Sequence, residues 1–329
     1  MPKTARGLLA WFLGAAIALG TVTAEAGPAE TVAAVVGLKA EVPSDARTAD
    51  TLGRMRSGSG VVIDSGGLVL TVGYLIVEAS AVDLYPADGK RVPADIVGYD
   101  HETGLGLVRA RSDLGIAPIR IGRSKGIGVG EPLLVLSRDG PLGGGEVKLA
   151  SRREFAGYWE YLLPDALFAT PPHPAFAGAA LIDREQRLVG IGSLMVGDAA
   201  ADDVESPGNM FVPVDALGPI LGDLLAMGRR DSPGNPWVGM STQEHGGHLI
   251  VRSVADDGPA ETAGVRPGDV VLGVGGVEVD SLAEFYRGMW GLGAPGVRVP
   301  LRIMRGQQVM ELTVPSTDRL RWLKLDQTY

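Results

Sequence analysis

The sequence predicts a mainly β protein that ends in a smaller unit of mixed α and β structure. Between residues 59 and 200, short runs of Val, Ile and Leu recur at spacings of about ten residues, which is typical of sandwiches and barrels. Gly, Pro and Asp separate these runs, and the chain holds 48 Gly and 22 Pro, as tight turns require. From residue 237 onward, strand-like runs alternate with two helical patterns.

Length, charge and cysteine content restrict the class of protein. A chain of 329 residues is long enough for two domains. The net charge of -9, without a cluster of Lys and Arg, argues against a nucleic-acid partner. The chain has no cysteine, so it must rely on a hydrophobic core, for which 45% apolar residues suffice. We expect no cofactor and no metal.

The first 26 residues predict a signal peptide. Lys3 and Arg6 precede an apolar stretch at 8–20, and "AEA" at 24–26 fits cleavage before Gly27. The apolar stretch is shorter than the roughly 20 residues that a spanning helix needs. A retained membrane anchor is the alternative.

The first domain is expected over residues 27–228. It opens with a strand-like run, "TVAAVVGLKAEV", and closes with a helix within 211–230 that Asp215 would cap. The apolar residues of this helix recur at helical spacing: Leu217, Ile220, Leu221, Leu224 and Leu225. The polar segment 229–236, with Gly and Pro, predicts a linker to a second domain at 237–329.

The run "GPAETAGVRPGDVVLGVGG" gives the second domain its strongest signature. Residues 259–263 predict a short helix ended by Gly264, and Ser281 is a candidate N-cap for the helix "SLAEFYRGM". Over 237–315 the sequence resembles a PDZ domain of the bacterial type.

The PDZ resemblance implies a binding site for extended segments or C-termini of proteins and peptides. In this mode the ligand adds as a strand, and backbone amides of a small loop receive its terminal carboxylate. The loop corresponds to Trp237, Val238, Gly239 and Met240, and the facing side chains would be Leu282, Phe285, Tyr286 and Met289. The alternative is that these four side chains pack the domain's own core.

The segment "EHGGH" raises the question of a metal site. His245 and His248 have no Cys or carboxylate at ligand spacing, and two Gly between them favour a hairpin turn. We expect a solvated turn.

Three segments of the first domain carry a second resemblance: "GSGVVIDSGGLVLT", "PADGKRVPADIVGYD" and "FVPVDALGPILGDLL". Over residues 31–228 they resemble the chymotrypsin-like domain of HtrA-type (DegP-like) periplasmic serine proteases. The resemblance implies a double β-barrel, each barrel six-stranded, with the active site between them, and a periplasmic location. Many relatives form trimers through aromatic contacts near the mature N-terminus. Residues 27–58 contain no Phe, Tyr or Trp, so we expect a monomer.

The catalytic positions of that family are altered in this sequence. Such a site needs a hydroxyl nucleophile, an imidazole base and a carboxylate that orients the base. In "TVGYLIV" the base position holds Tyr74, in "TGLGLV" the carboxylate position holds Gly104, and in "AFAGAAL" the nucleophile position holds Ala177. A phenol has a pKa near 10 and is a poor base at neutral pH. Residues 171–181 contain no Ser, Thr or Cys.

Few residues near these three positions could take over the catalytic roles. His101 and His173 are the only histidines of this domain, and His173 is the better candidate for a hidden role, although no hydroxyl lies near it in the sequence. An oxyanion hole needs backbone amides held by a glycine-rich turn. The corresponding segment here, "AFAG", has one glycine, Gly178, and contains the bulky Phe176. We expect Tyr74, Phe176 and the neighbouring alanines to fill the former cleft.

The sequence favours a protein without protease activity. The leading interpretation is an exported, non-catalytic HtrA-like pseudoprotease that acts as scaffold, adaptor or chaperone through its PDZ domain. One alternative is an active serine endopeptidase in periplasmic quality control with displaced catalytic residues. Another is a dedicated structural subunit of a periplasmic or membrane complex, in which the barrels dock the partner.

Overall fold

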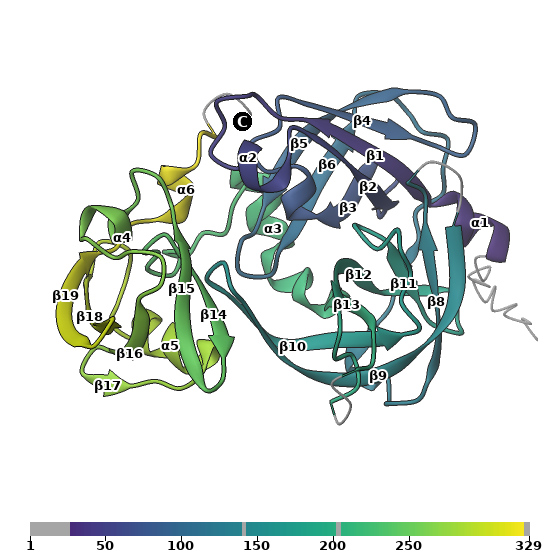
Figure 1. Cartoon of the computed structure of the whole chain (residues 1–329). Helices are drawn as coiled ribbons and strands as arrows, with labels where there is room; N and C mark the ends of the chain where they lie inside the picture. The colour runs from purple at the N-terminus through teal and green to yellow at the C-terminus, as the bar shows by residue number, and fades with distance from the viewer. Residues whose placement is uncertain (1–26, 140–142, 202–204, 326–329) are drawn as a thin grey trace, which may run out of the picture.

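The computed structural model describes residues 27–139, 143–201 and 205–325. The predicted signal peptide lies outside the described residues. Among the described residues no helix is long and apolar enough to cross a membrane. The chain forms two closed β units and a third, smaller domain beside them (Figure 1).

The first β unit is a closed antiparallel barrel in the order β1-β2-β3-β6-β5-β4. Its strands are β1 (Val35–Glu41), β2 (Met55–Val62), β3 (Leu68–Val72), β4 (Ala81–Tyr85), β5 (Val92–Tyr99) and β6 (Leu105–Ala110). The helix α1 (Pro28–Ala33) precedes β1, α2 (Ala49–Leu52) lies between β1 and β2, and the 3-10 turn η1 (Gly73–Leu75) lies between β3 and β4. The six-stranded barrel that the resemblance implied is therefore present.

The strand expected to begin at Thr31 begins four residues later, so this part of the prediction was wrong. Residues 28–33 form α1, and Val35 starts β1. Pro28 occupies the first helical turn, where its missing N–H leaves no hydrogen bond unmade. The apolar run alone could not separate a short helix from a strand.

The second β unit closes through pairing of β11 with β12, in the order β11-β8-β9-β10-β13-β12. Its strands are β8 (Pro132–Ser137), β9 (Gly143–Gly157), β10 (Tyr161–Thr170), β11 (Ala180–Ile182), β12 (Arg187–Val196) and β13 (Gly208–Pro213). The two-residue β7 (Arg120–Ile121) adds in parallel to β12, and the turn η2 (Ser124–Gly126) follows it. The long β9–β10 hairpin projects from this barrel to the third domain (Figure 1).

The expected helix near residue 217 is present, but its expected cap is not. The turn η3 (Val214–Ala216) leads into α3 (Gly218–Met227), and Leu217 stands at the N-cap position. The side chain of Asp215 accepts hydrogen bonds from the Ser124 hydroxyl and from the Lys125 amide at 3.0 Å. It is therefore engaged by η2 and does not cap α3.

The C-terminal domain is a sheet in the order β14-β15-β16-β18-β19, with β17 beside β16. Its strands are β14 (Met240–His245), β15 (His248–Val254), β16 (Val270–Val274), β17 (Val277–Glu278), β18 (Arg298–Arg305) and β19 (Gln308–Pro315). Its helices are α4 (Pro259–Thr262), α5 (Leu282–Trp290) and α6 (Arg319–Trp322). Ser281 caps α5 by accepting from the Glu284 amide at 3.2 Å, as predicted.

Candidate functional site

The predicted base position, Tyr74, is tied to both barrels. It lies in η1, directly after β3, and its hydroxyl donates a 2.8 Å hydrogen bond to the carbonyl oxygen of Ser193 in β12. The Arg56 guanidinium donates to the carbonyl oxygen of Tyr74 at 2.8 Å. Burial raises the pKa of the Tyr74 hydroxyl above its ordinary value. The hydroxyl is thus a protonated donor at neutral pH and does not act as a base.

The predicted carboxylate position, Gly104, adjoins η1 through a backbone contact. Its carbonyl oxygen accepts from the Gly73 amide at 2.7 Å. Its φ is 77°, a left-handed value that favours glycine. A Cβ atom here would lie 3.3 Å from the Tyr161 hydroxyl, which donates to the Thr103 carbonyl at 2.8 Å. An aromatic ring therefore occupies the direction in which a side chain would extend.

The predicted nucleophile position, Ala177, lies in the turn before β11. Its carbonyl oxygen accepts from the Ser59 amide at 2.8 Å, which links the turn to the first barrel. The amide of Gly178 donates to the Gly192 carbonyl at 2.9 Å, one residue from the Ser193 that Tyr74 contacts. The structure therefore brings Tyr74, Gly104 and Ala177 into one neighbourhood between the barrels.

The expected filling of the cleft is met in part. Tyr74 and Ala177 pack against the barrel core, but the ring of Phe176 is only half-buried and lies outside the core among the described residues. The Phe176 carbonyl oxygen accepts from the Ala179 amide at 3.0 Å. A Cβ atom on Gly192 would lie 2.1 Å from that oxygen, so glycine is required there.

The two histidines of the barrels have different surroundings. The backbone amide of His173 donates to Asn209 Oδ1 at 2.6 Å, while its buried Nδ1 has no partner among the described residues. Ser137 Oγ is buried and equally without a partner among them. A Cβ atom on Gly143 would lie 3.0 Å from that oxygen and 3.3 Å from His173 Nε2. A serine therefore lies near His173 in space, which the sequence did not reveal.

His101 is half-buried at the junction with the C-terminal domain. Its Nδ1 lies 2.8 Å from the Tyr99 hydroxyl, and its Nε2 lies 2.9 Å from Arg319 Nη1. Burial, and then the charge of Arg319, lowers the pKa of His101 well below its ordinary value. A neutral ring that accepts from Arg319 has a structural role here.

The predicted carboxylate loop of the C-terminal domain holds a side chain of the barrels. The carboxyl group of Glu160 accepts from the amides of Val238 at 3.0 Å, Gly239 at 2.7 Å and Met240 at 3.0 Å. Burial raises the pKa of Glu160 to about 7, against the opposing effect of these amides and of Arg319. The sequence analysis missed Glu160, because nothing in "GYWEY" marks it as more than a turn residue.

The groove beside this loop is occupied by the same turn, residues 157–161 between β9 and β10. The Thr242 amide of β14 donates to the Tyr158 carbonyl at 3.0 Å, and the Tyr286 hydroxyl donates to the Gly157 carbonyl at 2.7 Å. The four predicted facing side chains on α5 are all buried: Leu282, Phe285, Tyr286 and Met289. Their burial agrees with the alternative that these side chains pack the domain's own core, and Tyr286 also contacts the turn.

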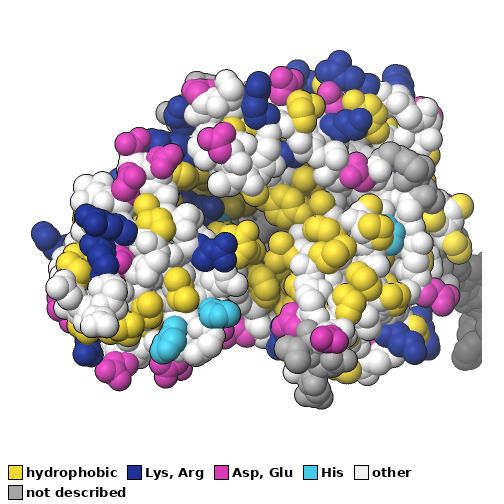
Figure 2. Space-filling model, in the orientation of Figure 1, with side chains coloured by type: hydrophobic (Ala, Val, Ile, Leu, Met, Phe, Trp, Pro, Cys, Tyr) yellow, Lys and Arg dark blue, Asp and Glu magenta, His cyan; other side chains and the backbone are white. Residues whose placement is uncertain are grey.

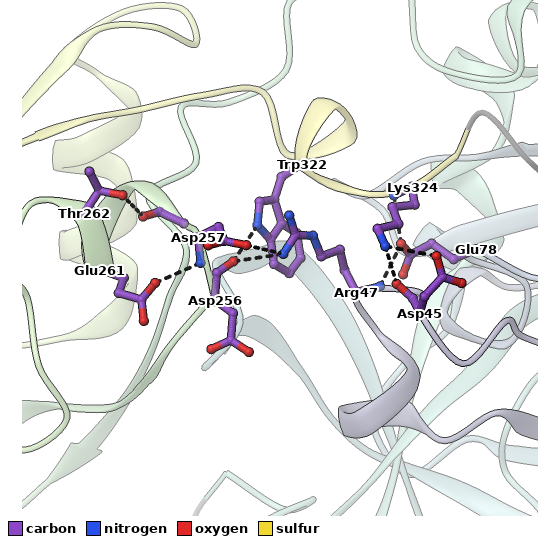
Figure 3. Close-up of polar contacts among 10 residues, drawn as sticks. Asp45, Arg47, Glu78, Asp256, Asp257, Glu261, Thr262, Trp322 and Lys324 are labelled. Carbon is purple, nitrogen blue, oxygen red and sulfur yellow. Dashed lines mark hydrogen bonds and ion pairs between the residues drawn. The ribbon is translucent and has the colours of Figure 1, made fainter.

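The chain's C-terminal segment returns to the first barrel and joins the domains a second time (Figure 3). Arg47 lies over the Trp322 ring and pairs with Asp257 at 3.1 Å. The buried carboxylate of Glu78 accepts from the Lys324 amide at 2.8 Å. Leu323 is buried against residues of the first barrel. Figure 2 shows hydrophobic side chains gathered in the hollowed middle of this face, where the domains meet.

A cavity of about 510 Å³ lies at this junction and not beside Ala177. Residues of both domains line it, among them Asp100, Arg230, Trp237, Asp318 and Arg319. Arg230 pairs with Asp100 at 3.0 Å and Arg319 donates to the Trp159 carbonyl at 2.9 Å, so these charges are engaged.

His245 and His248 face each other across the β14–β15 turn and are exposed. Within residues 27–139, 143–201 and 205–325, no three His, Cys, Asp or Glu side chains gather as metal ligands would.

Two family models match separate segments of the chain. The family model described as "Trypsin-like peptidase domain" matches residues 58–191, and the model described as "PDZ domain" matches residues 236–315.

Three curated relatives span most of the chain. The serine protease Do-like HtrA of Bacillus subtilis is 25% identical over 290 residues, which cover 77% of this chain and 62% of the relative. The serine endoprotease DegS of Haemophilus influenzae is 26% identical over 78% of this chain and 76% of its own. A probable periplasmic serine endoprotease, DegP-like, of Brucella suis is 25% identical over 78% of this chain and 52% of its own. The chain thus spans only about half to three quarters of these relatives.

The fold has solved counterparts. The HtrA-type protease AlgW, solved with a tripeptide, superposes with a TM-score of 0.51 at 21% identity and covers 88% of this chain and 96% of that one.

Proposed function

Because this chain joins a trypsin-like peptidase domain to a PDZ domain and is homologous to the HtrA, DegP and DegS proteases, we propose that it is a non-catalytic member of that family. It acts as a scaffold, adaptor or chaperone that binds the C-termini or extended segments of other proteins through its PDZ domain.

One observation carries this proposal: the Tyr74 hydroxyl donates to the Ser193 carbonyl where the family's base would stand. An imidazole base must accept a proton from the nucleophile and return it to the leaving group. A buried phenol with a raised pKa performs neither step at neutral pH. The methyl group of Ala177 and the absence of a side chain at Gly104 agree with the same reading.

A second candidate function is a serine endopeptidase with displaced residues, since the relatives are named serine proteases. Ser137 and His173 favour it, because Ser137 Oγ and His173 Nδ1 are buried without a partner among the described residues, and the two side chains lie near each other. No hydrogen bond joins their side chains, and no carboxylate contact to His173 is found in the described part of the chain. Both features are needed to activate a serine.

The cellular location and the oligomeric state are further parts of this proposal. Relatives are named periplasmic, so we propose that the protein is exported to the periplasm and that residues 1–26 are removed there. We further propose a monomer, because residues 27–58 lack aromatic side chains. Sedimentation of the mature chain measures this directly, and a trimer would contradict it.

A dedicated role within a larger complex remains a distinct proposal. In that case the barrels hold the partner and the PDZ domain contributes little. Pull-down from the periplasm with the full chain and with a chain ending before residue 237 separates the two. Retention of the partner by the shortened chain favours docking on the barrels.

Casein digestion tests the non-catalytic proposal. We expect no release of peptides above buffer, and no change in the S137A or H173A variants. Digestion by the wild type that is lost in S137A would instead establish the displaced endopeptidase.

A further inference from the structure

The turn at residues 157–161 contacts the PDZ domain as a peptide ligand would. Three convergent amides, from Val238 to Met240, are the donors that a PDZ domain offers to a terminal carboxylate, and here they hold the carboxyl group of Glu160. Gly239 has a φ of 78°, and a Cβ atom on it would lie 2.9 Å from the Trp237 ring. The loop is therefore shaped for a carboxyl group, and an internal one fills it.

Backbone contacts extend the likeness beyond the carboxyl group. The Tyr158 carbonyl accepts from Thr242 at the start of β14, which is the strand beside which a peptide adds. On the opposite wall, the hydroxyl of Tyr286 in α5 donates to Gly157 and accepts from the Glu160 amide at 3.2 Å. Both walls of the groove are thus bonded to the turn.

Apolar contacts also hold the turn at 157–161 in the PDZ groove. Ala156 and Leu162, on either side of the turn, pack against the core of the PDZ domain. Glu160 is 3% exposed, so a partner has no access to the three amides while the turn is seated. Glu160 also has a φ of 58°, a left-handed conformation that a non-glycine residue keeps only when its surroundings hold it.

We propose that Glu160 is a built-in competitor for the PDZ groove, so that a partner with a free C-terminal carboxylate binds only after the turn at 157–161 has been displaced. This inference rests on the proposed peptide-binding function. The ligand is a chain end: an amidated terminus lacks the second acceptor oxygen and cannot replace a carboxyl group on three donors. Displacement also frees the β9–β10 turn, whose half-buried Trp159 ring then becomes available to solvent.

The size of the effect follows from population arithmetic. When the binding-competent state is a minor one, the apparent dissociation constant is raised by the inverse of its population. A competent fraction of about 1–10% corresponds to a change of about 10- to 100-fold.

The experiment compares the full chain with its E160A variant. Each is titrated with a fluorescein-labelled decapeptide mixture, randomised at its last four positions, with a free C-terminal carboxylate and, separately, as the amide. We expect E160A to bind the free acid about 10- to 100-fold more tightly than the wild type, and neither to bind the amide. E146Q, at an exposed position in β9, is the matched charge control and should equal the wild type.

Hydrogen exchange at the amides of residues 238–240 measures their contact with Glu160 without any added peptide. We expect slow exchange in the wild type and fast exchange in E160A. Y286F removes only the hydroxyl that bonds the turn. We expect it to speed the exchange of these amides and to tighten binding of the free acid, but by less than E160A does. It provides an independent variant if E160A folds poorly.

Two results would overturn the proposal, and they differ in what they say of the function. Equal affinity of wild type and E160A for the free acid would show that Glu160 does not compete, while peptide binding stands. Fast exchange in E160A without binding of the free acid would show an open groove that takes no chain end, and the peptide-binding function would fail with it.

Discussion

The Tyr74 hydroxyl donates a hydrogen bond of 2.8 Å to the carbonyl oxygen of Ser193, and so joins the first barrel to the second. At the position where the sequence analysis predicts the base of a serine protease, the side chain is thus fixed as a structural bridge. Our proposal of a non-catalytic, HtrA-like protein rests on that relationship.

Replacing Tyr74 by Phe removes this bridge. We expect Y74F to lower the free energy of unfolding by about 1 kcal/mol, the usual net contribution of one hydrogen bond, with some addition because a carbonyl loses its partner. Urea unfolding at pH 7 measures the change. Y158F removes a hydroxyl from an exposed ring and should leave stability unchanged. Equal stability of Y74F and wild type would contradict the structural role.

Gly104 is expected to resist restoration of the family's carboxylate. Its φ of 77° and the nearby Tyr161 hydroxyl make any side chain costly. We expect G104A and G104D to lose about 1–2 kcal/mol of stability, the cost of the left-handed conformation. G145A, in β9 with open space around its Cβ position, is the control and should not be destabilised. A G104D variant as stable as wild type would show that the position still accommodates a carboxylate.

The junction of the domains depends on Glu78. Its buried carboxylate accepts from the Thr48 amide at 2.8 Å and the Thr48 hydroxyl at 2.7 Å. It also accepts from the Lys324 amide at 2.8 Å (Figure 3). The charge of the largely buried Arg56 lies close by. Because E78Q leaves that charge without its counterion, we expect a loss of about 3 kcal/mol in urea unfolding. D45N, at an exposed ion pair with Lys324, should change stability by less than about 1 kcal/mol.

Closure of the PDZ groove should depend on pH through Glu160. Its pKa is about 7 when buried and 4.5 in its ordinary state, so the closed form binds a proton that the open form releases. The resulting stabilisation of closure is full below about pH 4.5 and is lost as pH rises through about 7, by up to about tenfold per pH unit. The groups that face Glu160 are the guanidinium of Arg319 and the hydroxyl of Tyr286, whose raised pKa keeps it protonated.

His101 also titrates on opening, in the opposite sense, since its pKa is lowered in the closed form. Measuring the ratio of wild-type to E160A affinity for the free-acid mixture in an H101Q background removes this contribution, because neither protein then carries the imidazole. We expect the advantage of E160A to be largest at pH 5 and to shrink toward pH 8. A ratio that is constant over this range would contradict titration of Glu160.

The sequence predicted the architecture because its signals are local. Evenly spaced apolar runs with turn residues predicted the barrels, and the run around Pro259 predicted the PDZ domain. One error of the sequence analysis has a local cause, because the apolar run at 31–42 extends the predicted strand over α1. The other has a distant cause: Asp215 was expected to cap a helix, but Ser124, 91 residues away, engages it.

The contacts that give the site its character could not be predicted from sequence. Glu160 meets Val238 across 78 residues, and the Tyr74 hydroxyl meets a backbone carbonyl whose residue type carries no signal. Ser137 likewise approaches His173 only through the strands that carry them. In each case the packing of distant parts of the chain determines which residues come into contact, and no local sequence pattern records that packing.

Reaction with a fluorophosphonate, followed by intact mass, tests the central claim most directly, because the reagent needs an activated serine and no knowledge of the substrate. The account predicts that the mature wild-type protein keeps its unmodified mass, as does A177S, which regains a hydroxyl but no base. A single adduct on the wild type, mapped to a serine of the barrels, would contradict it.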